Sequence, residues 1–339
     1  MAVIMLLIAF GTRPEWIKIK PVVDAIDGKI PYRLLYTGQH TDIIDSSLEN
    51  YKYNKILIEN KLSPNRLDSI VCSIMAMIDA HLEGITHVMV QGDTTTVFAV
   101  GLACFHRGIK VIHLEAGLRT YDIQHPYPEE FNRQSVSCLT DIHLCATELA
   151  ANNLYAESKG GKIHIVGNTV LDNLRGQVAN QDDQVLVTLH RRENHKQIDR
   201  WFRVIDTLAG NNQDLSWILP MHPNPNVTKY KYLLKNVAVT EPLPHHYLLK
   251  ILKNARLVIT DSGGIQEESA FFSKPCIVCR EKTERQEGLG EFSWLCQDPE
   301  QLENLFYKLK DHKIDRSLPC PYGDGYASEK ILNILKEEI

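Results

Sequence analysis

The chain has 339 residues, of which 44% are hydrophobic and 23% are charged. This length exceeds one typical domain and predicts two, and the hydrophobic content excludes an intrinsically disordered chain. The formal net charge of −5 argues against nonspecific binding to nucleic acid or to a membrane surface, so we expect neither as a partner.

The chain opens with an apolar run, Ala2–Phe10, that is too short to span a bilayer and lacks the basic flank and cleavage site of a signal peptide. We expect the first buried strand there. Strand-like runs then alternate with helical patterns on both sides of a polar stretch at residues 170–183. The predicted strands are Ile4–Phe10, Arg33–Thr37, His87–Gln91, Lys110–Glu115, Asp141–Ala146, Lys162–Val166, Gln184–Leu189, Leu215–Met221, Val237–Thr240, Arg256–Ile259 and Pro275–Cys279.

Such alternation predicts an α/β fold with mostly parallel, doubly wound sheets. The polar stretch divides the alternation into two series. We therefore place a first domain at residues 1–170, a second at 171–324 and a C-terminal helix at 325–339. This last helix could complete either domain.

The eight cysteines indicate reduced, buried thiols in a cytoplasmic protein, because disulfide frameworks belong to small secreted domains. Cys276 and Cys279 form a C-x-x-C pair. The pair lies in a strand-like run, however, and no second ligand pair follows at useful spacing. We therefore predict no metal site.

Polar residues follow the predicted strands of both domains. In open α/β sheets, ligands bind beyond the carboxyl ends of the strands, so we expect these polar tips to converge on one cleft. The tips are Gly11–Glu15, Gly38–His40, Gly92–Thr94, Glu115–Gly117, His190–Glu193, His222–Asn224 and Asp261–Gly264.

The tip Asp261–Gly264 lies between a predicted strand and a helical pattern that begins at Ile265. Bare amides and the positive helix end make such a turn an anion site, and its glycines allow a phosphate oxygen to approach closely. The sequence therefore favours a phosphorylated ligand. The alternative is an ordinary strand-to-helix turn capped by Ser262.

The tip after the first strand has the capping-box pattern Thr12-x-x-Glu15. It places Arg13 in the first turn of a helix, where a cation is unfavourable unless an anion is bound. The pattern therefore favours ligand binding at Arg13 over a plain helix start.

Several acids lie at the tips of the first domain. Carboxylates in a cleft can act as acid or base, and several at successive strand ends favour a catalytic pair. The alternative is a set of salt bridges with Arg119 and Arg133. The acids are Asp93, Glu115, Glu129 and Glu130.

His222 ends a predicted strand, and the Pro-Asn-Pro that follows fixes its backbone. Its imidazole can donate to a phosphate or act as an acid. The tip with His190 and Arg191 adds positive charge suited to a diphosphate. Five further histidines, by contrast, are expected to be solvated surface residues: His81, His106, His245, His246 and His312.

Two common nucleotide motifs are missing from the sequence. No G-x-G-x-x-G follows the first strand and no G-x-x-x-x-G-K-[ST] occurs, which disfavours NAD binding and ATP hydrolysis. Ser262 also lacks a G-x-S-x-G context, which disfavours an esterase.

Taken together, the tips closely resemble the motifs of the non-hydrolysing UDP-N-acetylglucosamine 2-epimerases. The matching segments follow the family's order from the first strand to the last helix, and the whole set is highly specific. They are GTRPEWIKIKPV, TGQH, QGDTTT, HLEAGLRT, PYPEEFNR, VGNTVLDNL, VTLHRREN, HPNPNV, TDSGGIQEE, KTERQEG and PYGDGYA.

The resemblance implies a glycosyltransferase-B-like fold with two Rossmann-like domains, a sugar nucleotide between them and a C-terminal helix that crosses back. It implies conversion of UDP-GlcNAc to UDP-ManNAc without an external cofactor. UDP would be eliminated to leave a 2-acetamidoglucal and then added back. The product would supply surface polysaccharide synthesis, and the enzyme would be a homodimer.

By motif position, the family's catalytic acids correspond to Asp93, Glu115 and Glu129, and His222 would stabilise or protonate the diphosphate. Glu268 would accept the ribose hydroxyls. The resemblance further implies a set of substrate-binding residues, namely Arg13, Lys18, Arg133, His190, Arg191, Ser262, Gly263, Gly264 and Arg285.

In related bacterial enzymes, residues after the TGQH motif help form a second, activating UDP-GlcNAc site. Gln39 and His40 match this motif as possible allosteric residues. The segment KILIENKLSPNRLDSIV departs from the family's pattern, and the loop after Arg285 is shorter. These departures leave open a C2 epimerase of an oxidised or diamino UDP-sugar.

Three further alternatives share the architecture or the ligand. A UDP-sugar glycosyltransferase needs no base aimed at C2 of its donor sugar. A hydrolysing epimerase releases free ManNAc, and its sequences resemble this chain less. A nucleotide-sugar binder without activity has no need for the acids and His222.

Overall fold

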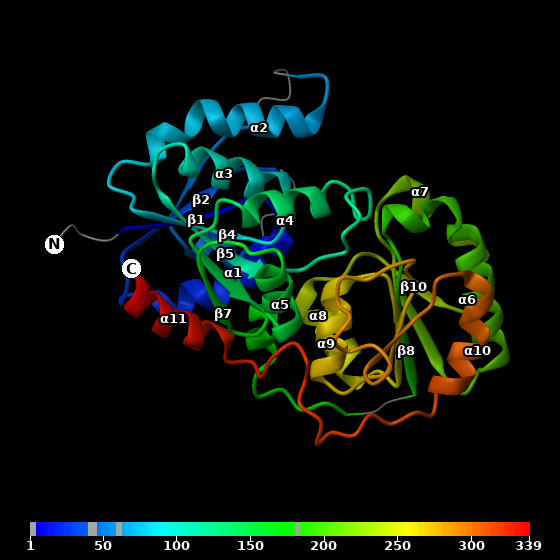
Figure 1. Ribbon diagram of the computed structural model, residues 1–339. Helices are drawn as coiled ribbons and strands as arrows, with labels where there is room; N and C mark the ends of the chain where they lie inside the picture. The colour runs from blue at the N-terminus through cyan, green and yellow to red at the C-terminus, as the bar shows by residue number, and fades with distance from the viewer. Residues whose placement is uncertain (1–4, 40–45, 59–62, 181–182) are drawn as a thin grey trace. The chain divides into compact units, whose positions relative to one another are not determined.

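The structure is a computed structural model that describes residues 5–39, 46–58, 63–180 and 183–339. The chain forms two compact units, Met1–Asn173 with Gly323–Ile339, and Leu174–Tyr322. Figure 1 shows both units, and each is described by itself below.

The first unit contains a seven-stranded sheet with the order β3-β2-β1-β4-β5-β6-β7. All neighbouring strands are parallel. The strands are β1 (Leu6–Phe10), β2 (Tyr32–Tyr36), β3 (Tyr53–Lys55), β4 (His87–Gln91), β5 (Lys110–Ala116), β6 (Ile142–Cys145) and β7 (Lys162–Ile165).

Helices cover both faces of this sheet, and β1 shows why. Leu6, Ile8 and Phe10 join one core cluster, whereas Leu7 and Ala9 join the other, as the alternation of side chains along a strand requires. The first cluster includes α1 and α11, and the second includes α2 and α3. The helices of this unit are α1 (Arg13–Ile26), α2 (Arg66–Met77), α3 (Thr95–Phe105), α4 (Glu129–Ser137), α5 (Glu148–Ala156) and α11 (Ala327–Glu338).

The second unit contains a six-stranded parallel sheet with the order β10-β9-β8-β11-β12-β13. Trp201 and Phe202 of α6 and Phe306 of α10 fill the core on one face. The strands are β8 (Gln184–Thr188), β9 (Ser216–Pro220), β10 (Ala238–Thr240), β11 (Leu257–Thr260), β12 (Cys276–Val278) and β13 (Ser293–Leu295). The helices are α6 (Ile198–Asn211), α7 (Pro225–Thr228), α8 (His245–Asn254), α9 (Gly263–Phe271) and α10 (Pro299–Leu309).

Each predicted strand is present, so the doubly wound α/β prediction is confirmed. The first strand begins at Leu6, and its predicted first residue, Ile4, lies outside the described residues; the other strand ends differ from the prediction by at most one residue. The sequence missed β3 and β13. Both have three residues and lie at sheet edges, and three residues are too few to show a period.

The C-terminal helix α11 crosses back to the first unit. Ile331, Leu332 and Leu335 are buried in the cluster that α1 also joins, and α11 lies beside α1 in Figure 1. The backbone amides of Ala327 and Ser328 donate to the Asp172 carboxylate at 3.0 and 2.7 Å. This carboxylate therefore caps the start of the helix.

The cysteine prediction holds for five thiols: Cys104, Cys145, Cys276, Cys279 and Cys296 are buried and free. It is wrong for Cys72 and Cys138, which are exposed, and Cys320 is half-buried. Apolar neighbours in sequence misled the prediction, because Cys72 lies on the exposed side of α2 and Cys138 is the exposed residue that follows α4.

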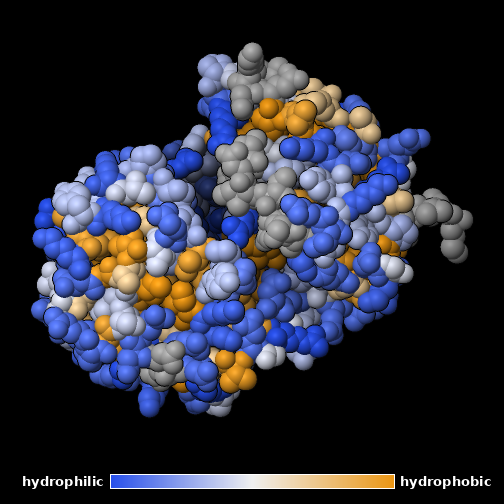
Figure 2. All heavy atoms as spheres, turned by 180° about the vertical axis from the view of Figure 1, so that it is seen from behind, coloured by the Kyte–Doolittle hydropathy of each residue, from blue (hydrophilic) through white to orange (hydrophobic). Residues whose placement is uncertain are grey.

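No helix in the described part of the chain is long and apolar enough to cross a membrane. Figure 2 shows hydrophilic side chains over most of one face of the molecule, with hydrophobic residues in separate patches between them.

Candidate functional site

Strand order reverses at one place in each sheet, and this places the candidate sites. In the first sheet, β2 and β3 lie on one side of β1, and β5, β6 and β7 lie on the other side, beyond β4. In the second sheet, β9 and β10 lie on one side of β8, and β12 and β13 lie on the other side, beyond β11. Ligands of open α/β sheets bind beyond the carboxyl ends of the strands at such switch points. The candidate ligand groups are therefore the residues that follow β1 and β4 in the first unit, and β8 and β11 in the second.

In the first unit, the side chain of Glu15 joins the tips of β1 and β4. Its carboxylate accepts from the Gly11 amide at 3.1 Å, from the Thr12 hydroxyl at 2.6 Å and from the Thr94 hydroxyl at 3.0 Å. Burial raises the pKa of Glu15 to about 7, against the lowering effect of these hydrogen bonds. The predicted capping box is present, and it also connects two strand tips.

Arg13 begins α1, as predicted, and is half-buried. Its Nε finds no hydrogen-bond partner among the residues that the structure describes. A cation at the positive end of a helix with an unsatisfied donor is suited to bind an anion.

Glu115 lies at the irregular end of β5. The register between β5 and β6 shifts between Leu114 and Ala116, and Glu115 has a φ of 65°. A non-glycine residue in this left-handed region is uncommon, and such strained residues cluster at functional sites. The Glu115 carboxylate accepts from Lys18 Nζ and from Gln91 Nε2.

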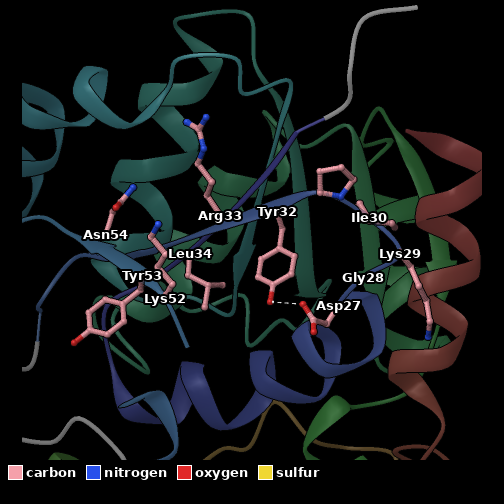
Figure 3. Close-up of a pocket in the computed structure, with 11 residues that line it drawn as sticks. Asp27, Gly28, Lys29, Ile30, Tyr32, Arg33, Leu34, Lys52, Tyr53 and Asn54 are labelled. Atoms are coloured by element: carbon pink, nitrogen blue, oxygen red, sulfur yellow. Dashed lines mark hydrogen bonds between the residues drawn. The ribbon is translucent and has the colours of Figure 1, made fainter. Parts of the chain in front are cut away.

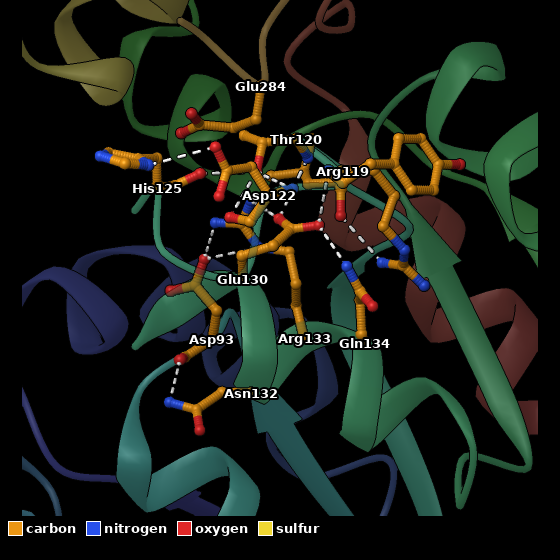
Figure 4. A network of polar contacts seen from close by, with 12 residues as sticks. Asp93, Arg119, Thr120, Asp122, His125, Glu130, Asn132, Arg133, Gln134 and Glu284 are labelled. Carbon is orange, nitrogen blue, oxygen red and sulfur yellow. Dashed lines mark hydrogen bonds and ion pairs between the residues drawn. The ribbon is translucent and has the colours of Figure 1, made fainter. Parts of the chain in front are cut away.

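Asp93 belongs to a charged network on the tips of β4 and α4 (Figure 4). Arg133 donates to the Asp93 carboxylate from Nε at 3.1 Å and to the buried Glu130 at 3.0 Å. Glu130 in turn accepts from the amides of Thr120 and Tyr121, at 3.1 and 3.0 Å. Arg133 is thus fixed between two carboxylates, with Asp93 at the more exposed end of the network.

Glu129, the third predicted acid, begins α4 next to Glu130 and is half-buried. The salt-bridge alternative is correct for Arg133, which pairs with Asp93 and Glu130. It is wrong for Arg119, whose guanidinium pairs with Glu157 at 2.6 Å.

The sequence did not single out His113. Its Nε2 donates to the Gly92 carbonyl at 2.7 Å. Burial lowers the pKa of this imidazole to about 3, so it remains neutral and supports the turn that presents Asp93. Only the position of this histidine in a buried strand hinted at such a role.

In the second unit, the fully buried Asp261 organises the tips of β8 and β11. Its carboxylate accepts from the amides of His190 and Arg191, at 2.9 and 2.8 Å, and from Asn194 Nδ2 at 2.9 Å. Three donors from one loop therefore fix the backbone that carries the two predicted binding residues.

His222 follows the neighbouring strand β9, and its ring is stacked on that of His190. The ring centroids are 5.3 Å apart and the planes differ by 14°. The Asn224 amide donates to His222 Nδ1 at 3.2 Å, so the neutral ring carries its proton on Nε2. Burial, and then the adjacent His190, lower the pKa of His222.

Helix α9 begins at Gly263, two residues earlier than predicted, because both glycines adopt helical angles. Its first intrahelical bond joins the Gln266 amide to the Ser262 carbonyl at 3.1 Å, which leaves the amides of the first turn unused within the helix. Within the described part of the chain, the Ser262 side chain makes no capping bond. The alternative of a turn capped by Ser262 is therefore wrong.

Arg285 lies directly over the start of α9. A Cβ on Gly263 would come within 2.6 Å of Arg285 Cζ, whereas a Cβ on Gly264 would meet, among the described residues, only Ser262 Oγ, at 4.0 Å. Arg285 is buried and pairs with Glu284 and, at 2.6 Å, with Glu267. Two carboxylates thus already oppose its charge, which the sequence did not reveal.

Glu268 faces α8 and is 2% exposed. Its Oε1 contacts His245 Nε2 at 2.7 Å, and its Oε2 has no hydrogen-bond partner among the described residues. A buried, unsatisfied carboxylate oxygen is suited to accept a ligand hydroxyl. The prediction that His245 is a surface residue is wrong, because it is half-buried against Glu268. His81 is also half-buried, whereas His106, His246 and His312 are exposed as predicted.

Gln39, which the resemblance marked as an allosteric residue, binds the first turn of α3. Its Oε1 accepts from the amide and the hydroxyl of Thr96, at 3.1 and 2.8 Å. This contact caps the start of α3. His40 lies outside the described residues.

A hollow of about 770 Å³ in the first unit contains none of these groups. Figure 3 shows its lining at the amino end of β2, where the Tyr32 hydroxyl donates to Asp27 at 3.1 Å. The side chains there do not converge on one point. The lining residues lie where β2 and β3 begin, whereas the switch-point residues follow the carboxyl ends of β1 and β4. We do not assign the ligand to it.

The described groups suit two chemical tasks. Carboxylates of the first unit can exchange a proton with a weak carbon acid. Helix α9, with His222, supplies donors for an anionic leaving group.

Comparison with known proteins gives a consistent result. The family model described as UDP-N-acetylglucosamine 2-epimerase matches residues 25–336. The UDP-N-acetylglucosamine 2-epimerase of Campylobacter jejuni is 36% identical, with 97% of each chain covered. The enzyme of the same name from Salmonella borreze is 35% identical, over 96% of this chain and 97% of the relative.

Solved structures agree with the sequence comparison. The crystal structure of UDP-GlcNAc 2-epimerase from Neisseria meningitidis, bound to UDP-GlcNAc, superposes with a TM-score of 0.86. It is 33% identical and covers 99% of this chain and 100% of that chain. The predicted glycosyltransferase-B-like fold, with its returning C-terminal helix, is confirmed.

Proposed function

Because this chain belongs to the UDP-N-acetylglucosamine 2-epimerase family, we propose that it interconverts UDP-GlcNAc and UDP-ManNAc by inverting C2 of the sugar. The observation that carries the proposal is the strained Glu115, whose carboxylate is held between Lys18 and Gln91 at a strand end. Asp93 follows the adjacent strand β4, and Glu129 begins α4.

The reaction begins with removal of the C2 proton. A carboxylate of the set Asp93, Glu115 and Glu129 takes the proton, and the electron pair of the C2–H bond forms a C1=C2 double bond. UDP leaves with the electrons of the C1–O bond, and 2-acetamidoglucal remains. Re-addition of UDP at C1, with a proton delivered to the other face of C2, gives the epimer.

Departure of UDP requires positive potential at the diphosphate. The amides at the start of α9 and the Nε2–H of His222 supply donors, and Arg13 adds a cation at the start of α1. Glu268 Oε2 accepts a ribose hydroxyl. Ser262, Gly263, Gly264, His190 and Arg191 complete the nucleotide contacts, with Lys18, Arg133 and Arg285 as supporting cations.

The proposal extends to the setting of the reaction. The enzyme works in the cytoplasm as a homodimer and needs no external cofactor. Its product supplies surface polysaccharide synthesis.

A proton NMR time course in D2O with UDP-GlcNAc tests the proposal. We expect UDP-ManNAc to appear with deuterium at C2, because the transferred proton exchanges with solvent. Free ManNAc with UDP would instead identify a hydrolysing enzyme. Absence of both turnover and C2 exchange would contradict the proposal and turn the search to other UDP-sugars.

The site assignment is tested by Asp93→Asn and His222→Ala. Each is expected to lower kcat by about 100-fold or more, because each removes a group that acts in the transition state. Circular dichroism should show that the fold persists. Wild-type kcat in both variants would refute the assignment, and Lys235→Ala, an exposed residue after β9, is the control.

A further inference from the structure

His190 and Asp261 have no chemical step of their own in the reaction, yet their geometry concerns His222. The tips of β9, β8 and β11 are neighbours in the sheet and carry His222, His190 and Asp261, respectively. The three side chains therefore form one connected set across adjacent strands.

Asp261 is the fixed end of this set. It is fully buried and accepts from the His190 amide with both oxygens, at 3.1 and 2.9 Å. Its Oδ1 lies 3.4 Å from His190 Nδ1. From the other side, His195 Nε2 donates to the His190 carbonyl at 3.1 Å. Hydrogen bonds thus fix the backbone of His190, and the Asp261 carboxylate contacts its ring.

The held ring of His190 forms a flat support for His222. The two rings are nearly parallel, 14° apart, with centroids separated by 5.3 Å. Among the described residues, the backbone holds one edge of the His222 ring, where the Asn224 amide donates to Nδ1 at 3.2 Å. One hydrogen bond leaves the ring free to turn about its χ angles, and the stacked imidazole restricts that rotation.

We propose that His190, anchored by Asp261, is a positioning residue that holds the His222 imidazole with its Nε2–H presented to the departing diphosphate. In this role His190 acts through His222, in addition to its proposed contact with the nucleotide. The kinetic part of this inference rests on the proposed function, whereas the structural part does not.

The charges around His222 agree with this role. The groups that face it are His190 and His195 from the tip of β8 and Asp261 from the tip of β11. The neighbouring His190 and His195 disfavour a positive charge on His222 and so lower its pKa, whereas the Asp261 carboxylate raises it. The set therefore favours the neutral donor form of His222 at neutral pH.

Selective ¹⁵N labelling of histidine tests the structural part in the full-length protein. Long-range ¹H–¹⁵N spectra distinguish Nδ1–H from Nε2–H, and the His222 signal is assigned by its loss in His222→Gln. We expect one Nε2–H tautomer in the wild-type protein and a mixture in His190→Ala. An unchanged single tautomer in His190→Ala would overturn the inference.

Kinetics with UDP-GlcNAc test the consequence. His190→Ala is expected to lower kcat about 100-fold, the effect of a misplaced catalytic group, with a smaller change in KM. His190→Phe retains a flat ring and is expected to recover about tenfold of that loss. A His190→Phe variant as impaired as His190→Ala would refute the stacking role.

The control is His312→Ala, because His312 also packs on an aromatic ring, Trp294, but lies outside the site. It should leave kcat and the His222 tautomer unchanged. If the wild-type protein did not act on UDP-GlcNAc while the His222 tautomer still depended on His190, the proposed function would fail and this inference would stand.

Discussion

At the scale of single residues, the candidate site of the first unit contains a carboxylate, that of Glu15, which is almost completely shielded from solvent. Glu15 is 2% exposed, yet it accepts three hydrogen bonds from two strand tips. Desolvation outweighs these bonds, and the pKa of the carboxyl rises to about 7. The residue that joins the Arg13 turn to the Asp93 turn is therefore sensitive to pH near neutrality.

This pKa predicts the sign of a stability change. Because the folded pKa of about 7 exceeds the ordinary 4.5, the folded protein binds more protons than the unfolded chain between these values. The stability contributed by Glu15 therefore falls as pH rises from 4.5 to about 7. Glu15→Gln stays neutral, so its stability relative to wild type should improve by up to about 3 kcal/mol across this window.

Urea denaturation of both proteins at several pH values measures this difference. Glu83→Gln, an exposed substitution in the same unit, should show little pH dependence relative to wild type. A Glu15→Gln difference that is independent of pH would contradict the assigned pKa.

At the scale of elements, the strand–turn–helix from β11 to α9 shows how two adjacent glycines differ. Both lie in the first helical turn. Gly263 has the Arg285 guanidinium close to its Cα, whereas a Cβ on Gly264 would be no closer than 4.0 Å to Ser262 Oγ. The buried Arg285 is held by Glu267 and Glu284 and cannot move away freely.

Gly263→Ala and Gly264→Ala form a matched pair. Gly263→Ala is expected to destabilise the fold by about 1–3 kcal/mol, because the new methyl group overlaps Arg285. Gly264→Ala is expected to be neutral or to stabilise the helix by up to about 1 kcal/mol. Thermal unfolding followed by circular dichroism compares them, and equal midpoints would contradict the close contact at Gly263.

At the scale of the whole molecule, the chain returns to its first unit after completing the second. Helix α11 packs beside α1 and buries Ile331 and Leu335 in the core of the β1 sheet. The Asp172 carboxylate fixes its start. The first unit is therefore complete only when the last residues of the chain are in place.

Leu335→Ala tests this dependence. Loss of a fully buried leucine is expected to destabilise the first unit by about 2–5 kcal/mol. Hydrogen exchange should increase in β1 and α1 and change little in β8 and β11. Glu337→Ala, at an exposed position of the same helix, is the control. Equal increases in both units would contradict the assignment of α11 to the first.

The sequence was sufficient for features that repeat along the chain. Buried strands such as β1 and β4 are runs of apolar residues, and short-range signals such as Thr12-x-x-Glu15 depend on neighbours three residues apart. The edge strands β3 and β13 escaped because pairing with a neighbour, rather than local pattern, defines them.

Motif order also sufficed to identify the family, because sugar-nucleotide chemistry limits which residues can occupy the strand tips. Contacts between residues that are distant in sequence could be identified only from the tertiary structure. Examples are Glu115 with Lys18 and Gln91, Arg285 over Gly263, and His222 stacked on His190. Such contacts join residues that are far apart in sequence, so no local period encodes them, and they decide which charges are already balanced and which donors remain for a ligand.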